Sequence, residues 1–299
     1  MEAARTAQLL ELRKELAKAE AKAEEASRKA EQASKRRASI DIALDPPPTW
    51  TSCSHGGVQV VDLDLRSAEA MRVVAHFEQT SKLAPRPISA HRWKPSDFKS
   101  VEVLSVSRVE NPAMWRQFAL LRREVIKREG ATSARALQRI ERAGLFHGCT
   151  DEVAASIMHQ GFNRSYAGIA NKQGGANYGR GTYLARDAGY SMSKRFAKRD
   201  ECGVSCMLYC RLVVGEYCRG ESTMITPPLR DPARQLLYDS TVDSVERPEI
   251  FVAFKDGQAY PEYLIKFFQP PPNHVAMPLS TSSLSLSGAL TPPALKRRR

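Results

Sequence analysis

The 299-residue sequence lacks any run of about 18 consecutive apolar residues, the length that a membrane-spanning helix needs. Its first residues are charged and rich in alanine, unlike the apolar centre of a secretory signal peptide. We therefore expect no membrane partner and an intracellular protein, in the nucleus or the cytoplasm. The hydrophobic content of 42% is nevertheless sufficient for a sizeable core.

Cysteine is scarce, with 6 residues in the chain, and the spacing does not resemble a small secreted disulfide framework. Cys202, Cys206 and Cys210 are close enough in sequence to raise the question of a zinc site. Cys206 and Cys210 fall in a strand-like run, where four residues span roughly 13 Å, too far for two side chains to share one ion. We expect no metal ion, and core or strand positions for these cysteines.

Two common nucleotide-binding motifs are also absent. Gly174 and Gly179 have the spacing of a P-loop, but Arg180 and Gly181 stand where lysine and serine or threonine are required. The segment from Gly179 to Leu184 lacks the third glycine of a dinucleotide fingerprint. The sequence therefore supports neither a P-loop kinase nor a Rossmann-type dehydrogenase.

Positive charge is in excess, at a formal net +12. Residues 272–299 contain no acid and four basic residues at their end, which gives 4 − 0 = +4 for that segment. The other basic residues are spread along the chain. The excess is compatible with binding the phosphates of a dinucleotide or of RNA, and it identifies no partner.

The composition divides the chain into regions. Leucine and alanine recur at steps of three and four along residues 1–40, on one seam of a predicted helix: Leu9, Leu12, Leu16, Ala19, Ala23, Ala26, Ala30 and Ala33. Because alanine buries little area, the pattern fits a solvated helix as well as a self-associating coiled coil. Residues 41–49 predict a linker, residues 50–270 a single α+β domain and residues 271–299 a disordered basic tail.

Local signals predict the first elements of the α+β domain. An amphipathic helix is expected from Ser67 to Thr80, and a strand from Ser100 to Glu110. Asn111 is a predicted N-cap, Pro112 the first helical residue, and Gly130 the residue that closes this second helix.

Similar signals continue through the second half of the domain. Thr150 is a predicted N-cap of a short helix that stops near Gly161. Residues 162–178 are polar and Gly-rich, as in a loop that covers a substrate. Three strands are expected later, over residues 208–214, 250–254 and 263–268.

Three short motifs follow one another in the middle of the chain. They are Leu145-Phe146-His147-Gly148, then Tyr178 to Tyr183, then Gly189-Tyr190-Ser191. These residue types suit cleavage of the bond between nicotinamide and ribose in NAD⁺, which requires a held carboxamide, a sandwiched ring and an oriented ribose. The motifs together predict a nicotinamide-recognition site.

Each requirement has a candidate residue. Gly148 lacks a Cβ, so its backbone can approach the carboxamide, and the Ser191 hydroxyl can donate to the carboxamide oxygen. Tyr183 and Phe196 could enclose the nicotinamide ring by stacking. His147 could hydrogen-bond the ribose hydroxyls and fix the sugar.

On these motifs, together with Asn111 to Trp115 and Leu208 to Val214, the chain resembles the catalytic domain of the poly(ADP-ribose) polymerase family. The resemblance runs from about Pro46 to Gln269 and is closest to the mono-ADP-ribosylating branch of these diphtheria-toxin-like ADP-ribosyltransferases. It implies the ADP-ribosyltransferase fold, with two packed, mainly antiparallel sheets and flanking helices. It also implies that residues 162–178 form the donor loop over NAD⁺.

Polymer-forming members of the family carry a His-Tyr-Glu triad. His147 and Tyr183 match its first two positions, whereas the third aligns with Ile250, so the glutamate is replaced. Glu249 would point to the opposite face of its strand, and Glu262 lies in a later segment outside the triad. Because isoleucine has no charge and no hydrogen-bonding atom, chain extension should be lost.

The sequence therefore predicts a mono-ADP-ribosyltransferase that uses NAD⁺ as a co-substrate, releases nicotinamide and modifies proteins. Acidic acceptor side chains are favoured because they are already ionised at neutral pH. The predicted catalytic positions are His147, Tyr183 and Ile250, and the predicted NAD⁺-binding residues are His147, Gly148, Tyr183, Ser191 and Phe196. Two alternatives stay open: a weak or inactive scaffold of the same fold, and an RNA-directed transferase that modifies a terminal phosphate.

Overall fold

The computed structural model describes residues 14–15, 18–29, 44–51, 57–82, 101–166, 176–193 and 195–268. The basic tail predicted over residues 271–299 lies outside the described residues, as do parts of the predicted N-terminal helix, linker and donor loop. Residues 18–29 are helical and exposed, and Glu24–Arg28 and Glu25–Lys29 ion pairs line this helix. Its self-association stays a prediction.

The helices begin where the sequence provides capping residues. Asn111 accepts a hydrogen bond from the backbone N–H of Met114 and Thr150 from that of Val153, as predicted. Ser67, which was expected to be the first helical residue, is instead an N-cap that accepts from the backbone N–H of Ala70. Gly130 ends α3 in the left-handed conformation, with φ 61°. The helices are α2 (Ala68–Ser81), α3 (Pro112–Glu129), α4 (Ala134–Ile140), α5 (Asp151–Gln160) and α6 (Ala188–Ser191), and a 3-10 turn spans Arg164–Tyr166.

The strands form one long sheet in the order β1-β2-β11-β5-β3-β4-β10-β9-β6, and β7 and β8 form a separate hairpin. Every neighbouring pair is antiparallel except β6 and β9. The strands are β1 (Gln59–Asp62), β2 (Glu102–Glu110), β3 (Glu141–Cys149), β4 (Thr182–Ala185), β5 (Val204–Val213), β6 (Tyr217–Arg219), β7 (Leu229–Asp231), β8 (Leu236–Leu237), β9 (Ser240–Val242), β10 (Ile250–Ala253) and β11 (Ala259–Phe268).

The predicted α+β class and the mainly antiparallel pairing are confirmed, with one difference in detail. The two expected sheets are two halves of a continuous ladder, because β3 pairs with β5 on one side and reaches β4 on the other. Phe146 and Ala185 are the single residue pair that joins β3 to β4. The halves therefore meet at a narrow junction beside His147.

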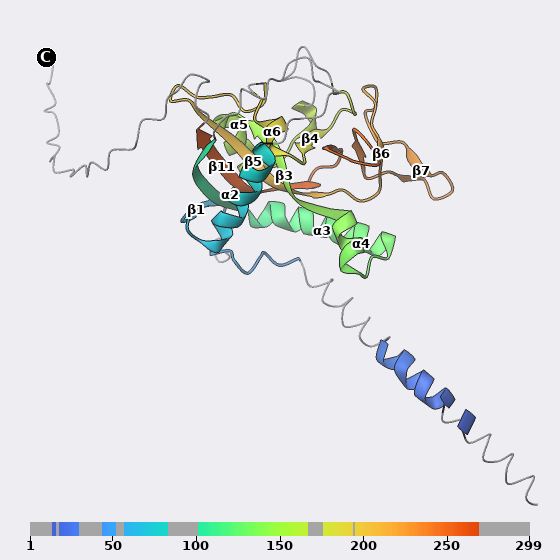
Figure 1. Cartoon of the computed structure of the whole chain (residues 1–299). Helices are drawn as coiled ribbons and strands as arrows, with labels where there is room; N and C mark the ends of the chain where they lie inside the picture. Colours follow the sequence, from blue (N-terminus) through green and yellow to red (C-terminus); the bar gives the residue numbers. More distant parts are fainter. Residues whose placement is uncertain are drawn as a thin grey trace, which may run out of the picture.

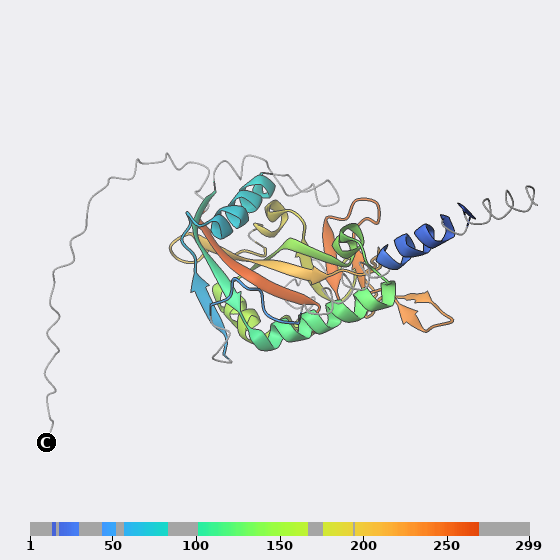
Figure 2. The same cartoon turned by 90° about the horizontal axis from the view of Figure 1, so that it is seen from below.

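The sheet is packed on both faces. Alternate residues of β5 point to opposite sides, so that Met207 joins the cluster under Phe77 of α2, while Leu208 joins the cluster under Ile157 of α5. On the face away from α2, α3 packs through Phe118 against Tyr260 of β11. Figures 1 and 2 show α2 and α3 on opposite sides of the sheet.

A buried amide connects the segments around β10. The Gln258 side chain accepts hydrogen bonds from the backbone N–H groups of Phe254 and Lys255 and donates to the carbonyls of Val213 and Asp239. Only 2% of Gln258 is exposed. One side chain therefore satisfies four backbone groups that come from three parts of the chain.

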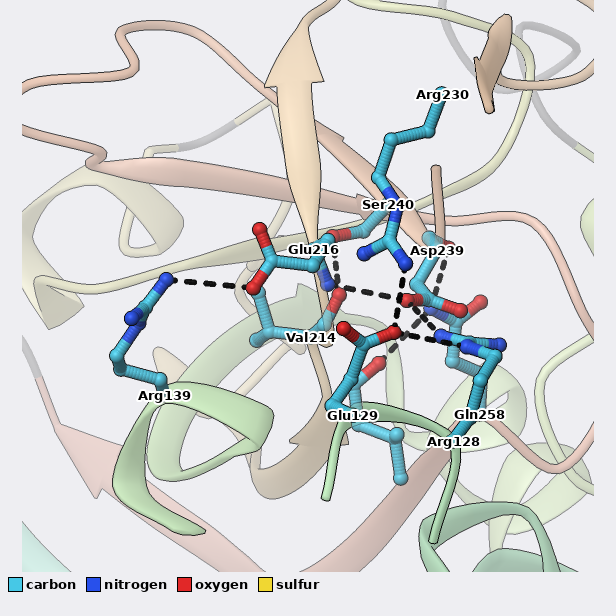
Figure 3. A network of polar contacts seen from close by, with 10 residues as sticks. Arg128, Glu129, Arg139, Val214, Glu216, Arg230, Asp239, Ser240 and Gln258 are labelled. Atoms are coloured by element: carbon cyan, nitrogen blue, oxygen red, sulfur yellow. Dashed lines mark hydrogen bonds and ion pairs between the residues drawn. The ribbon is translucent and has the colours of Figure 1, made fainter. Parts of the chain in front are cut away.

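An ion-pair network fixes the same region from the helix side. Arg128 at the end of α3 contacts the Asp239 carboxylate at 2.5 Å, and Glu129 pairs with Arg230 of β7 at 2.9 Å (Figure 3). Asp239 also accepts from the backbone N–H of Glu216. The β7–β8 hairpin and the start of β9 are thus held against α3.

We expect Gln258→Ala to lower the free energy of unfolding by about 2–4 kcal/mol, because four backbone groups would lose their buried partner. Denaturant-induced unfolding measures this change. Gln138→Ala, at an exposed position of α4, is the matched control and should stay within about 0.5 kcal/mol of the parent protein. Equal effects of the two substitutions would contradict the organising role of Gln258.

Candidate active site

His147 lies on β3 next to the junction with β4. Its Nδ1 atom is 2.8 Å from the backbone carbonyl oxygen of Tyr183. Because a carbonyl can only accept, Nδ1 carries the proton, and Nε2 of the neutral ring is left as an acceptor. Burial lowers the pKa of His147, while the bond to the Tyr183 carbonyl acts in the opposite direction. The ring is therefore neutral at physiological pH.

Tyr183 lies on β4, and two hydrogen bonds hold its hydroxyl group. Its hydroxyl donates to the carbonyl of Gly179 and accepts from the backbone N–H of Tyr178, each at 2.9 Å. Burial raises the pKa of Tyr183 to about 12, so the phenol stays neutral. The half-buried ring is fixed in place by its own loop.

Ser191 is buried on the short helix α6. Its hydroxyl donates to the carbonyl of Phe146, at 3.1 Å, so it binds the same strand that carries His147. The oxygen keeps the capacity to accept a further hydrogen bond. Donation to a carboxamide oxygen, as predicted, would require the hydroxyl to rotate away from Phe146.

Gly148 is tightly enclosed by the protein itself. A Cβ at this position would lie 2.2 Å from the backbone oxygen of Ser191 and 2.9 Å from Cβ of Phe196. The sequence-based reason for a glycine was close approach of a ligand. The structure gives a different one, the close packing of β3 against α6 and the turn that follows it.

The aromatic residues extend beyond those predicted. Phe196 stacks on Tyr190, with ring centroids 5.5 Å apart and an interplanar angle of 26°. Phe162 meets the His147 ring edge-on at 5.2 Å. Tyr190 adjoins Ser191 in the sequence, but α6 is too short for a periodic pattern that would have indicated which way Tyr190 faces.

Ile250 begins β10, opposite Ala185 of β4. It is buried, and Tyr178, Tyr183 and Tyr190 pack against the small apolar cluster that contains it. Its backbone N–H donates to the Asp243 carboxylate at 2.9 Å. The third predicted triad position is therefore an apolar contact for the tyrosines.

The two nearby glutamates are engaged elsewhere. Glu249 lies 3.4 Å from Arg186, and its backbone carbonyl accepts from the N–H of that arginine. Glu262 on β11 pairs with Arg211 of β5 at 2.9 Å. Both carboxylates therefore take part in ion pairs with arginines.

The structure thus brings the predicted residues together in two groups. His147, Tyr183 and Ile250 are joined through β3, β4 and β10, and Gly148 lies so near Ser191 and Phe196 that an added Cβ would clash with both. In the part of the chain that the structure describes, no group of three or more histidine, cysteine, aspartate or glutamate residues could hold a metal ion. Cys206 and Cys210 are buried on β5, in agreement with their predicted core or strand positions, whereas that prediction is wrong for Cys202, which is exposed in the turn before β5.

No helix in the described ranges is long and apolar enough to cross a membrane.

We expect Gly148→Ala to destabilise the protein by about 3 kcal/mol, since the added methyl group meets backbone atoms that cannot move independently. Gly130→Ala is the control, because a Cβ there meets nothing within 4 Å and only the left-handed φ opposes it. Gly130→Ala should lower the free energy of unfolding by about 1–2 kcal/mol. Thermal unfolding of the two variants compares them, and a smaller effect at Gly148 than at Gly130 would contradict the packing argument.

Comparison with known proteins agrees with this geometry. Residues 87–269, more than half of the chain, match the poly(ADP-ribose) polymerase catalytic domain. Human protein mono-ADP-ribosyltransferase PARP14 is 32% identical over 225 residues, which cover 75% of this chain and 11% of PARP14. Human protein mono-ADP-ribosyltransferase PARP11 is 35% identical over 229 residues, which cover 67% of this chain and 64% of PARP11.

Human protein mono-ADP-ribosyltransferase PARP12 is 33% identical over 165 residues, which cover 55% of this chain and 22% of PARP12. The chain therefore spans a minor part of PARP14 and PARP12 and somewhat less than two thirds of PARP11. The match of the catalytic domain over most of the chain establishes that this protein belongs to the poly(ADP-ribose) polymerase family.

Proposed function

We propose that this protein is an NAD⁺-dependent mono-ADP-ribosyltransferase that transfers ADP-ribose to protein acceptors and releases nicotinamide. The observation that carries the proposal is the hydrogen bond from the His147 ring to the backbone carbonyl of Tyr183, which lies beside the buried Ile250. The names of PARP14, PARP12 and PARP11, all mono-ADP-ribosyltransferases, support the reaction type.

The residues present fit a dinucleotide that ends in nicotinamide. Tyr183 and Phe196 offer half-buried aromatic rings for the flat nicotinamide, and Ser191 offers a hydroxyl for its carboxamide. The free Nε2 of neutral His147 can accept a hydrogen bond from a ribose hydroxyl. These contacts would hold the ribose while the glycosidic bond is cleaved.

In the proposed reaction the bond between ribose C1′ and the nicotinamide nitrogen breaks, and its electron pair leaves with neutral nicotinamide. The ribose carbon acquires oxocarbenium character, as in glycoside hydrolysis. An acceptor nucleophile then forms the new bond to C1′. The chain's contribution is orientation, which fixes the sugar and ring in a reactive geometry.

The acceptor must be nucleophilic without help from the third triad position. Ile250 is buried among tyrosines and offers no atom that could take a proton. A carboxylate acceptor is already ionised at neutral pH, so it meets this condition. The same apolar side chain would not activate a ribose hydroxyl, and the proposal therefore limits transfer to one ADP-ribose unit.

Incubation of the full chain with labelled NAD⁺ tests the proposal. We expect a protein product heavier by one ADP-ribose unit, sensitive to hydroxylamine, and lost in His147→Ala because the ribose is no longer oriented. His159→Ala is the matched control, since His159 is exposed on α5, and it should keep the activity.

Other products would contradict the proposal in distinct ways. A ladder of masses would overturn the assignment of Ile250 to the third position, and hydroxylamine resistance would exclude carboxylate acceptors. Label on added RNA would favour the RNA-directed alternative. No label on either acceptor would favour the scaffold.

The protonation of His147 predicts an acid limit for the reaction. Protonation would convert Nε2 from an acceptor into a donor, and the folded protein lowers the pKa below the usual 6.5. The value of kcat/KM for NAD⁺ should therefore stay level as the pH falls towards 6.5 and decline only below it. An apparent pKa above 6.5 on the acid side would be inconsistent with this role.

A further inference from the structure

Helix α6 carries Ser191 but lacks a cap from its own sequence neighbours. Asp187 occupies the N-cap position, with φ −109° and ψ 131°, yet its side chain makes no capping hydrogen bond. The Asp187 carboxylate is instead bound by the guanidinium of Arg186, with contacts of 2.6 and 3.1 Å. The first N–H groups of α6 therefore need another acceptor.

Thr80 of α2 provides that acceptor. The backbone N–H of Ala188 donates to the Thr80 hydroxyl oxygen at 3.2 Å, across 108 positions of sequence. The same hydroxyl donates to the carbonyl of His76 at 2.8 Å, which sets its orientation. Ala188 is fully buried and Thr80 is 6% exposed, so water does not compete for this contact.

Apolar packing brings the two helices together around this hydrogen bond. Val73 and Phe77 of α2 belong to the same buried cluster as Ala188 and Met192. On its other side α6 meets β3, where the backbone oxygen of Ser191 lies close to Gly148. The short helix is thus clamped between α2 and the strand that carries His147.

We propose that Thr80 is a positioning residue for the nicotinamide side of the site. Its hydroxyl fixes the start of α6 and, through α6, the place of Ser191 and of the stacked Tyr190 and Phe196 rings. Thr80 touches no substrate in this scheme. The inference rests on the proposed function, because it concerns the residues assigned to nicotinamide.

Thr80→Val is the decisive substitution, because valine keeps the volume and branching of threonine and removes only the hydroxyl. It leaves the Ala188 N–H buried without an acceptor. We expect the affinity for nicotinamide, measured by calorimetry on the full chain, to fall about tenfold, the size of effect that one lost buried hydrogen bond produces. The KM for NAD⁺ should rise by a similar factor while kcat changes less.

Two companion variants separate positioning from general damage. Thr80→Ser restores the hydroxyl and should restore nicotinamide binding. Ser81→Ala removes the next hydroxyl of α2. Ser81 is 5% exposed, and within the described residues its hydroxyl donates to the Glu78 carbonyl of its own helix, so this variant should bind nicotinamide as the parent does. Hydrogen exchange of residues 188–192 should quicken in Thr80→Val and in neither companion.

The outcomes distinguish this inference from the proposed function. Unchanged nicotinamide affinity in Thr80→Val, no rescue by Thr80→Ser, or an equal loss in Ser81→Ala would each overturn the positioning role. If the parent protein binds nicotinamide but transfers no label, the proposed function alone is contradicted. The nicotinamide-binding and hydrogen-exchange measurements would still decide the role of Thr80. A parent protein that binds no nicotinamide would overturn both.

Discussion

The hydrogen bond between the His147 ring and the Tyr183 carbonyl is the contact on which the site depends. The two halves of the sheet meet at one residue pair, Phe146 with Ala185, so this side-chain bond widens a junction that would otherwise be very narrow. It also sets which nitrogen of His147 carries the proton. Fold and chemistry are therefore coupled at one point, because the bond that joins β3 to β4 also leaves Nε2 as an acceptor.

Beside this contact lies the apolar side chain of Ile250, at the position that we propose replaces the glutamate of the triad. Ile250 lies in a cluster with the three tyrosines of the site, and burial raises the pKa of Tyr178, Tyr183 and Tyr190. The phenols therefore remain neutral, and the Tyr183 hydroxyl donates to the carbonyl of Gly179 in its own loop. In the proposed reaction this cluster would hold a ring and a sugar, and its isoleucine, which has no atom that can take a proton, would not activate a hydroxyl.

Much of the scaffold follows from short-range signals. Ser67, Asn111 and Thr150 each cap the helix that starts at the next residue, and Gly130 ends α3 because it adopts a left-handed φ. These interactions join residues a few positions apart, so the sequence alone contains them. The sequence likewise predicted β2 in full, together with the later parts of β5 and β11, whose first four residues lie outside the predicted spans.

The sequence by itself determined the caps at Asn111 and Thr150, several of the long elements and the order of the three motifs, because each is set by neighbouring residues. The nine-residue strand β3, which carries His147, was not predicted. Only the tertiary structure decided how the motifs meet. β4 and α6 have four residues each, too few for a periodic signal, and their places are set by contacts with distant strands and helices. Asp187 occupies the N-cap position of α6, but Arg186 binds its carboxylate, and the acceptor for the Ala188 N–H is Thr80 of the distant helix α2. Gly148 illustrates the same division: the motif identified the residue, and packing against Ser191 supplied the physical reason for it.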